Sequence, residues 1–214
     1  ADRWAVYRAA TGCTVSRQTG PTGQAYAMRV QRDSGNASTT AITAYHALES
    51  LDSYKFAGQT AYLKLTMKAG ANFSAASSSV TVKVTYGTGT DQSPEASWTG
   101  TTDALSTSQV ITTTSTSYDF DSISIPSTAT QVKVSVSFTP VGTASTNDWV
   151  EISAAQLSVN PAPGYERLPY KDTLALCQRY YQTGIGRWYG QATSGTAHGA
   201  TQSLPVVMRT TPTM

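Results

Sequence analysis

The run SVTVKVTYGTG, residues 79–89, places an apolar side chain at every second position, three valines and a tyrosine alternating with Thr and Lys. A period of two is that of a β-strand with one face buried and the other in water. The same alternation recurs in AYLKLTMKAG (61–70) and TQVKVSVSFTP (130–140), and Gly or Pro closes each run. These three runs predict the central strands of antiparallel sheets.

Weaker runs of the same kind predict further strands at 4–8, 13–18, 25–31, 40–48, 109–114, 117–125 and 149–159. Helical periodicity is almost absent, so the crossover helices that a parallel sheet needs are missing. About ten short strands with turn residues between them are typical of two packed sheets. We therefore predict an all-β fold, an antiparallel jelly-roll-like β-sandwich over residues 1–159.

The segment NPAPGYERLPY (160–170) contains three prolines and a glycine, which is the composition of a linker. We place a linker at 160–171 and a second region at 172–214, consisting of a short helix and an incomplete β-region. Asp172 is expected to cap this helix, with Leu174, Cys177 and Tyr181 on one side of it. The chain opens without Met inside a strand-like run, and we expect it to be part of a longer protein.

Composition excludes several classes of protein. Charged residues make up 13% of the 214 residues and the formal net charge is +2, without a basic block of the kind that binds nucleic acid. No run of 18 apolar residues is present, so membrane insertion is not expected. Two distant cysteines leave both a Cys13–Cys177 disulfide and two buried thiols open.

Catalytic motifs are lacking, and we predict that the chain is not an enzyme. His46 and His198, the two histidines, lie outside motifs such as GxSxG or HExxH. Asp119 and Asp121 alternate on one predicted strand and would share a face, so a glycosidase pair stays open beside the simpler interpretation as surface carboxylates.

No cofactor is expected, apart from a possible structural calcium ion. Jelly-roll sandwiches hold such ions through oxygen ligands at loop mouths, and the run STNDWVEIS offers Asn147, Asp148 and Glu151.

A sugar-binding surface pairs flat aromatic faces with short polar side chains. Trp98 lies in a loop with Pro and Gly, and Trp188 and Tyr189 lie between two glycines. Tyr118 is a further candidate, although its strand-like setting and that of Trp149 favour the core. Packing remains the alternative interpretation for each of these aromatic residues.

The segment around 160–181 resembles a family of phage virion proteins. In tail fibres and related structural proteins, a sandwich similar to a carbohydrate-binding module leads through an E-R-x-P-Y segment, here Glu166 to Tyr170, into the run LALCQRYY (174–181). The runs DWVEISAAQLSVNPAPGYE, GTGTDQSPEASWTG and ADRWAV are also similar to that family. In this resemblance the LALCQRYY run is a structural join between the sandwich and the next β-region, formed by Leu174, Cys177, Arg179, Tyr180 and Tyr181.

The resemblance implies a structural virion protein of a tailed phage, most simply a fibre that attaches to glycans on the host surface. Its expected partners are two further copies of the chain in a homotrimer, other virion proteins and the host glycan. One alternative is a head fibre or capsid decoration protein. Another is a carbohydrate-binding module of a secreted polysaccharide-degrading enzyme.

Overall fold

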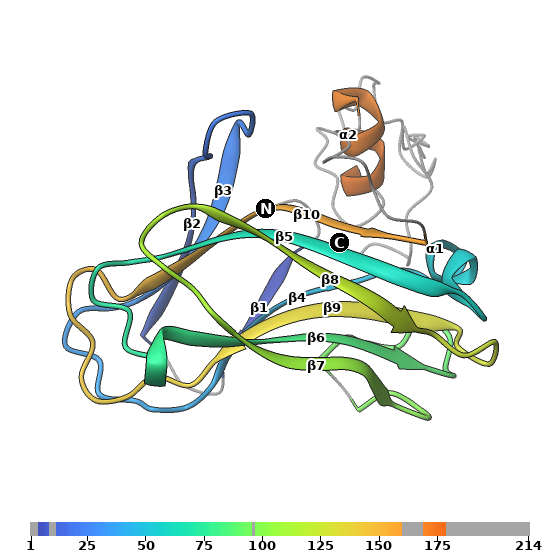
Figure 1. Cartoon of the computed structure of the whole chain (residues 1–214), viewed down its shortest axis with the longest axis horizontal. Helices are drawn as coiled ribbons and strands as arrows, with labels where there is room; N and C mark the ends of the chain where they lie inside the picture. The colour runs from blue at the N-terminus through green and yellow to red at the C-terminus, as the bar shows by residue number, and fades with distance from the viewer. Residues whose placement is uncertain (1–3, 9–11, 96, 160–168, 179–214) are drawn as a thin grey trace, which may run out of the picture. The chain divides into compact units, whose positions relative to one another are not determined.

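The structure, a computed structural model, describes residues 4–8, 12–95, 97–159 and 169–178. Contacts divide the chain into two compact units, one over residues 3–166 and one over residues 167–214. The first unit is a sandwich of two antiparallel sheets (Figure 1), which confirms the predicted fold class. No helix in the described part of the chain is long and apolar enough to cross a membrane.

Each sheet has five strands. Sheet A has the order β1 (Ala5–Arg8), β4 (Ile42–Ala47), β9 (Gln131–Phe138), β6 (Ser79–Gly87) and β7 (Thr102–Val110). Sheet B has the order β2 (Cys13–Thr19), β3 (Tyr26–Arg32), β10 (Trp149–Ser158), β5 (Thr60–Ala69) and β8 (Thr116–Ser124). The three most regular runs of the sequence form β5, β6 and β9, and each of these strands lies between two others, as their patterns predicted.

The core lies between the inner faces of the sheets. Val82 and Val84 of β6 and Leu65 of β5 are completely buried, and Val136 of β9 is 1% exposed. Burying a side chain of this size contributes about 1.5–3 kcal/mol. Since the inward positions are apolar, the residues between them point outward, and this parity decides which side chains can form a surface site.

A buried ion pair fixes one end of the sandwich. Arg32, 1% exposed, donates to the Asp148 carboxylate at 2.7 Å, and Asp148 is fully buried. The guanidinium also donates to the Ser74 hydroxyl and to three backbone carbonyls, those of Asn36, Ser38 and Gly142. These contacts join the connections β3–β4, β5–β6 and β9–β10, which lie together at one end (Figure 1).

Several sequence predictions need correction. The strand predicted at 109–114 is wrong, because β7 runs from Thr102 to Val110 and the chain leaves the sheet there. Its alternation is weak, with Ala104 and Leu105 only half-buried at the edge of sheet A. A short helix α1 (Ser50–Ser53) and two 3-10 turns, η1 (Tyr54–Phe56) and η2 (Ala76–Ser78), were not predicted and lie in connections between the sheets.

The second unit contains the predicted helix, α2 (Tyr170–Gln178). It begins two residues before the predicted start, so Asp172 lies in its first turn and does not cap it from outside. Leu174 is exposed and Cys177 half-buried on this helix. Arg179, Tyr180 and Tyr181 lie outside the described residues, as does the β-region predicted after them.

Candidate functional site

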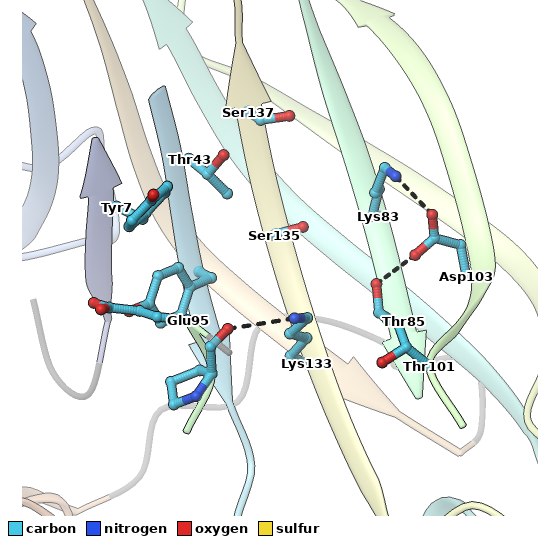
Figure 2. Close-up of a pocket in the computed structure, with 12 residues that line it drawn as sticks. Tyr7, Thr43, Lys83, Thr85, Glu95, Thr101, Asp103, Lys133, Ser135 and Ser137 are labelled. Atoms are coloured by element: carbon cyan, nitrogen blue, oxygen red, sulfur yellow. Dashed lines mark hydrogen bonds and ion pairs between the residues drawn. The ribbon is translucent and has the colours of Figure 1, made fainter. Parts of the chain in front are cut away.

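A shallow pocket of about 330 Å³ lies on the outer face of sheet A. Its floor is formed by outward positions of β1, β4, β9, β6 and β7, and its wall by the β6–β7 connection, residues 88–101. We call this pocket the sheet A groove (Figure 2). It is lined by Tyr7, Thr43, Tyr45, Lys83, Thr85, Pro94, Glu95, Thr101, Asp103, Lys133, Ser135 and Ser137.

The floor of the groove consists of the alternate residues of each strand that face outward, away from the core. Lys133, Ser135 and Ser137 alternate with the core valines of β9, and Lys83 lies opposite Ser135 on β6. Thr43 and Tyr45 of β4 lie opposite Ser137 and Ser135. The same alternation that fills the core therefore lines the outer face with hydroxyl and amino groups.

The wall is anchored by Trp98, whose indole is 4% exposed and donates to the Ser93 carbonyl at 3.0 Å. A Cβ at Gly87 would lie 3.1 Å from the Trp98 side chain, so the glycine permits this close packing. The prediction of Trp98 as a sugar-stacking platform is therefore wrong, because the connection folds back over its own tryptophan.

Further contacts fix the wall to neighbouring elements. The Ser50 backbone N–H donates to the Asp91 carboxylate at 2.8 Å, and the Asp91 backbone N–H donates to the Ser50 hydroxyl at 3.0 Å. Thr130 donates from its hydroxyl to the Gly89 carbonyl. These bonds place the wall beside α1 and the β8–β9 connection, so the groove is preformed.

Lys83 and Asp103 form an ion pair of 2.6 Å across β6 and β7 (Figure 2). The Thr85 hydroxyl also donates to Asp103 at 2.6 Å. Burial favours the neutral acid, but the hydrogen bonds from Lys83 and Thr85 outweigh it and hold the pKa of Asp103 below its ordinary value. The carboxylate is thus ionised at neutral pH.

Tyr45 and Glu95 connect the floor to the wall. The Tyr45 hydroxyl donates to Glu95 at 2.8 Å, and the Tyr45 ring is 5% exposed. Burial, followed by the hydrogen bond to the Glu95 carboxylate and its charge, raises the pKa of Tyr45 well above its ordinary value. Tyr45 therefore acts as a hydrogen-bond donor throughout the physiological range.

Lys133 lies on β9, the middle strand of sheet A, and its ammonium reaches toward the wall (Figure 2). The ammonium lies 4.6 Å from the centre of the Trp98 ring and 3.4 Å from the Pro94 carbonyl oxygen. Burial is the main cause that lowers its pKa, opposed by the charge of Asp103 and reinforced by that of Lys83.

Tyr7 contributes an exposed aromatic side chain to the groove. It is 48% exposed on β1, at the edge of sheet A, and its backbone pairs with Thr43. No sequence signal distinguished it from the other tyrosines, because its exposure follows from β1 being short and at the edge.

Tyr118, another aromatic residue predicted from the sequence, does not line this groove. Tyr118 is half-buried on β8 of sheet B and packs against the core. Trp188 and Tyr189 lie outside the described residues. Of the histidines, His46 packs on Trp4 with 5.9 Å between ring centres, whereas His198 is outside the described part of the chain.

The calcium ligands proposed from the sequence do not form an oxygen cage. Asp148 is committed to Arg32, Glu151 pairs with Arg29 at 2.6 Å, and Asn147 is exposed. Within the described residues no group of three His, Cys, Asp or Glu is placed to hold a metal ion. Arg32 and Arg29 form ion pairs with these two carboxylates, and the sequence prediction did not consider either arginine.

The proposed carboxylate pair of β8 lies away from the groove. Asp119 is exposed and pairs with Lys64 at 3.1 Å, and Asp121 is exposed on the same strand of sheet B. The two cysteines belong to different units, Cys13 buried in the sandwich and Cys177 on α2.

Comparisons with known proteins concern the fold alone. Neither a protein-family model nor a curated protein matches the chain. Among solved structures, a carbohydrate-binding module of the β-sandwich superfamily has a TM-score of 0.51 at 11% identity, covering 73% of this chain and 57% of that chain. A glycoside hydrolase domain, Endo-D from Streptococcus pneumoniae R6, has a TM-score of 0.50 at 14% identity, covering 75% of this chain and 22% of that chain.

A phage protein is also among the similar structures. The enzymatically active domain of tailspike protein 4 of bacteriophage CBA120 has a TM-score of 0.48 at 8% identity, covering 74% of this chain but 19% of that chain. This likeness is too low to carry an argument about the phage. The similar solved structures are thus mainly carbohydrate-binding-module β-sandwiches, and this chain has the same general fold.

Proposed function

We propose that the sandwich is a non-catalytic glycan-binding module and that the sheet A groove is its binding site. The observation that carries this proposal is the exposed ring of Tyr7 at one side of a preformed groove that also holds hydroxyls and the Lys83–Asp103 pair. The carbohydrate-binding module with a similar fold supports it.

The chemistry of the groove suits a sugar chain. The apolar face of a pyranose ring can stack on Tyr7, as apolar groups do on an aromatic face. Thr43, Thr101 and Ser137 can donate and accept hydrogen bonds, and Lys83 and Asp103 offer charged donors and acceptors to sugar hydroxyls. Shallow, hydroxyl-lined surfaces of this kind bind weakly at each site.

The absence of catalysis is part of the proposal. A glycosidase needs a carboxylic acid whose pKa is raised, beside a second carboxylate. Of the two carboxylates that line the groove, Asp103 has a lowered pKa and Glu95 is engaged by the Tyr45 hydroxyl. Binding is therefore better supported than hydrolysis.

A binding test separates the groove from other exposed aromatic surfaces. On a glycan array of bacterial polysaccharides, followed by calorimetry on the strongest ligand, Tyr7→Ala should weaken binding about tenfold, equivalent to about 1.4 kcal/mol. Tyr26→Ala is the control, because Tyr26 is 58% exposed on sheet B, under Arg17. Equal affinity of wild type and Tyr7→Ala would contradict the site.

We further propose that this module belongs to a tailed-phage virion protein, most simply a homotrimeric fibre on the extracellular particle. The LALCQRYY run (174–181), whose residues 174–178 lie in the second part of α2, supports this interpretation. Three weak sugar sites on one fibre would raise avidity by orders of magnitude. A head fibre or decoration protein is the variant with the same chemistry.

The second candidate is a carbohydrate-binding module of a secreted polysaccharide-degrading enzyme, favoured by the module of similar fold. Light scattering on the purified chain distinguishes the two. A mass of three times 22.7 kDa is expected for the fibre. A monomer over the whole measurable concentration range would favour the enzyme-borne module.

A further inference from the structure

The charged side chains of the sheet A groove are not all paired with one another. Lys83 and Lys133 lie on the neighbouring strands β6 and β9, and the charges that act on Lys133 are those of Lys83 and Asp103. The groove is lined by these two lysines and by two carboxylates, Asp103 and Glu95, so its formal charge is zero. Asp103 is already paired with Lys83 at 2.6 Å, so Lys133 is the groove lysine without an ion pair among the described residues.

The Lys133 ammonium is held in position without being neutralised. Its two contacts are the Trp98 ring at 4.6 Å and the Pro94 carbonyl oxygen at 3.4 Å, a long hydrogen bond. In the described part of the chain, no carboxylate forms an ion pair with Lys133. Since Lys133 is half-buried, its ammonium has lost part of its hydration and would gain from an anionic partner.

Glu95, the other carboxylate of the groove, does not form an ion pair with Lys133. Glu95 accepts the hydrogen bond of the Tyr45 hydroxyl at 2.8 Å. Because Trp98 is buried and bonded to Ser93, the wall cannot easily turn to bring Glu95 onto Lys133. The positive position therefore stays available to a bound molecule.

We propose that the glycan bound in the groove carries a carboxylate, as in a uronic or sialic acid unit, and that Lys133 receives this carboxylate as an ion pair. The inference rests on the proposed glycan-binding function and names its ligand class. The one unpaired ammonium matches the single charge of a carboxylate better than a phosphate ester, which carries about −1.5 to −2 at neutral pH.

The test uses matched pairs of sugars. Oligogalacturonate, oligoalginate and sialyllactose are each titrated beside the same molecule with its carboxylates reduced to alcohols, and a sulfated neutral oligosaccharide is included. The wild-type chain should bind at least one acidic member about tenfold more tightly than its reduced partner, a preference that falls with added salt.

Lys133→Met should bring the two affinities of that pair within about twofold, whereas Lys133→Arg should keep the preference. Lys64→Met is the matched control, because it removes the same charge from sheet B, where Lys64 pairs with Asp119. Thermal unfolding checks that each variant is folded. The ratio of the affinities for the acidic sugar and its reduced partner is compared between variants, so a general loss of affinity does not affect the result.

Three results would overturn the inference. Equal or tighter binding of the reduced sugars, with binding still lost in Tyr7→Ala, would leave the proposed function standing and refute the acidic ligand. A preference for the sulfated sugar alone would refute the carboxylate. Binding of no sugar, acidic or neutral, on these probes and on the polysaccharide array would refute the proposed function itself.

Discussion

The outer faces of the two sheets use similar residue types to opposite effect. On sheet B, the Trp149 ring is covered by Arg29 at 4.0 Å and by Lys68 at 5.6 Å, and Arg29 also pairs with Glu151. On sheet A, Tyr7 keeps 48% of its surface exposed, and the Lys133 ammonium lacks an ion pair within the described structure. The groups around Trp149 bind each other and stabilise the fold, whereas Tyr7 and Lys133 in the sheet A groove are open to a ligand.

The largest expected effect on stability concerns the buried Arg32–Asp148 ion pair at one end of the sandwich. Arg32→Met leaves the fully buried Asp148 carboxylate without its ion pair, and this should cost about 3–5 kcal/mol of unfolding free energy. Denaturant unfolding measures it. Arg29→Met, the same change on the same strand in a pair whose arginine is 23% exposed, should cost less than Arg32→Met.

A double variant tests whether the loss in Arg32→Met comes from the buried charge that is left on Asp148. Because much of that loss is the cost of one uncompensated buried charge, adding Asp148→Leu to Arg32→Met should recover part of it. If the double variant is less stable than the single one, the carboxylate acts mainly through the Ser74 backbone N–H, which donates to it at 3.0 Å.

The next largest effect on stability is expected from removing the covered Trp149 ring on the outer face of sheet B. Trp149→Ala removes a ring that is 7% exposed, and this should lower the unfolding free energy by about 3 kcal/mol while the folded protein keeps its affinity for glycan. Urea unfolding and calorimetry give the two numbers. A loss of affinity in the folded variant would mean that sheet B takes part in binding.

On sheet A, by contrast, a substitution should lower the affinity for glycan more than the stability of the fold. Lys83→Met removes a partly exposed ion pair, so stability should change by less than about 1 kcal/mol. Glycan affinity should nevertheless fall several-fold, since Lys83 offers a charged donor to the groove. A loss of stability without a loss of affinity would assign the pair a purely structural role.

The smallest effect is in the pH dependence of stability. The pKa of Asp103 is lower in the folded than in the unfolded chain, so its contribution is complete above its ordinary value of 3.8 and is lost as pH falls below it. Asp103→Asn should flatten the acid limb of stability against pH below about pH 4. An unchanged acid limb would contradict the lowered pKa.

The sandwich was predictable because its central strands carry the signal locally. The alternating valines of 79–89 specify a strand, its buried face and its antiparallel setting at once, and no distant information is needed. The edge strand β7 was misplaced because Thr and Ser fill both of its faces, so a shift in position changes little in the pattern.

The site could not be predicted, because its parts are joined only by folding. Lys83 and Asp103 are 20 residues apart, and the Arg32–Asp148 pair that replaced the expected calcium ligands is separated by 116 residues. Trp98 looked exposed from its neighbours, yet its connection folds back over it. Tyr7 carried no signal, because its exposure depends on the position of β1 in the sheet.

The most direct test of the sheet A groove as the binding site is to map the bound glycan by amide chemical-shift changes in a ¹⁵N-labelled chain titrated with the strongest array ligand. We expect the largest shifts on the sheet A groove, at Thr43, Lys83 and Ser137, with little change at Lys64 or Glu151 of sheet B. Shifts concentrated on sheet B or on α2, with sheet A unchanged, would contradict it.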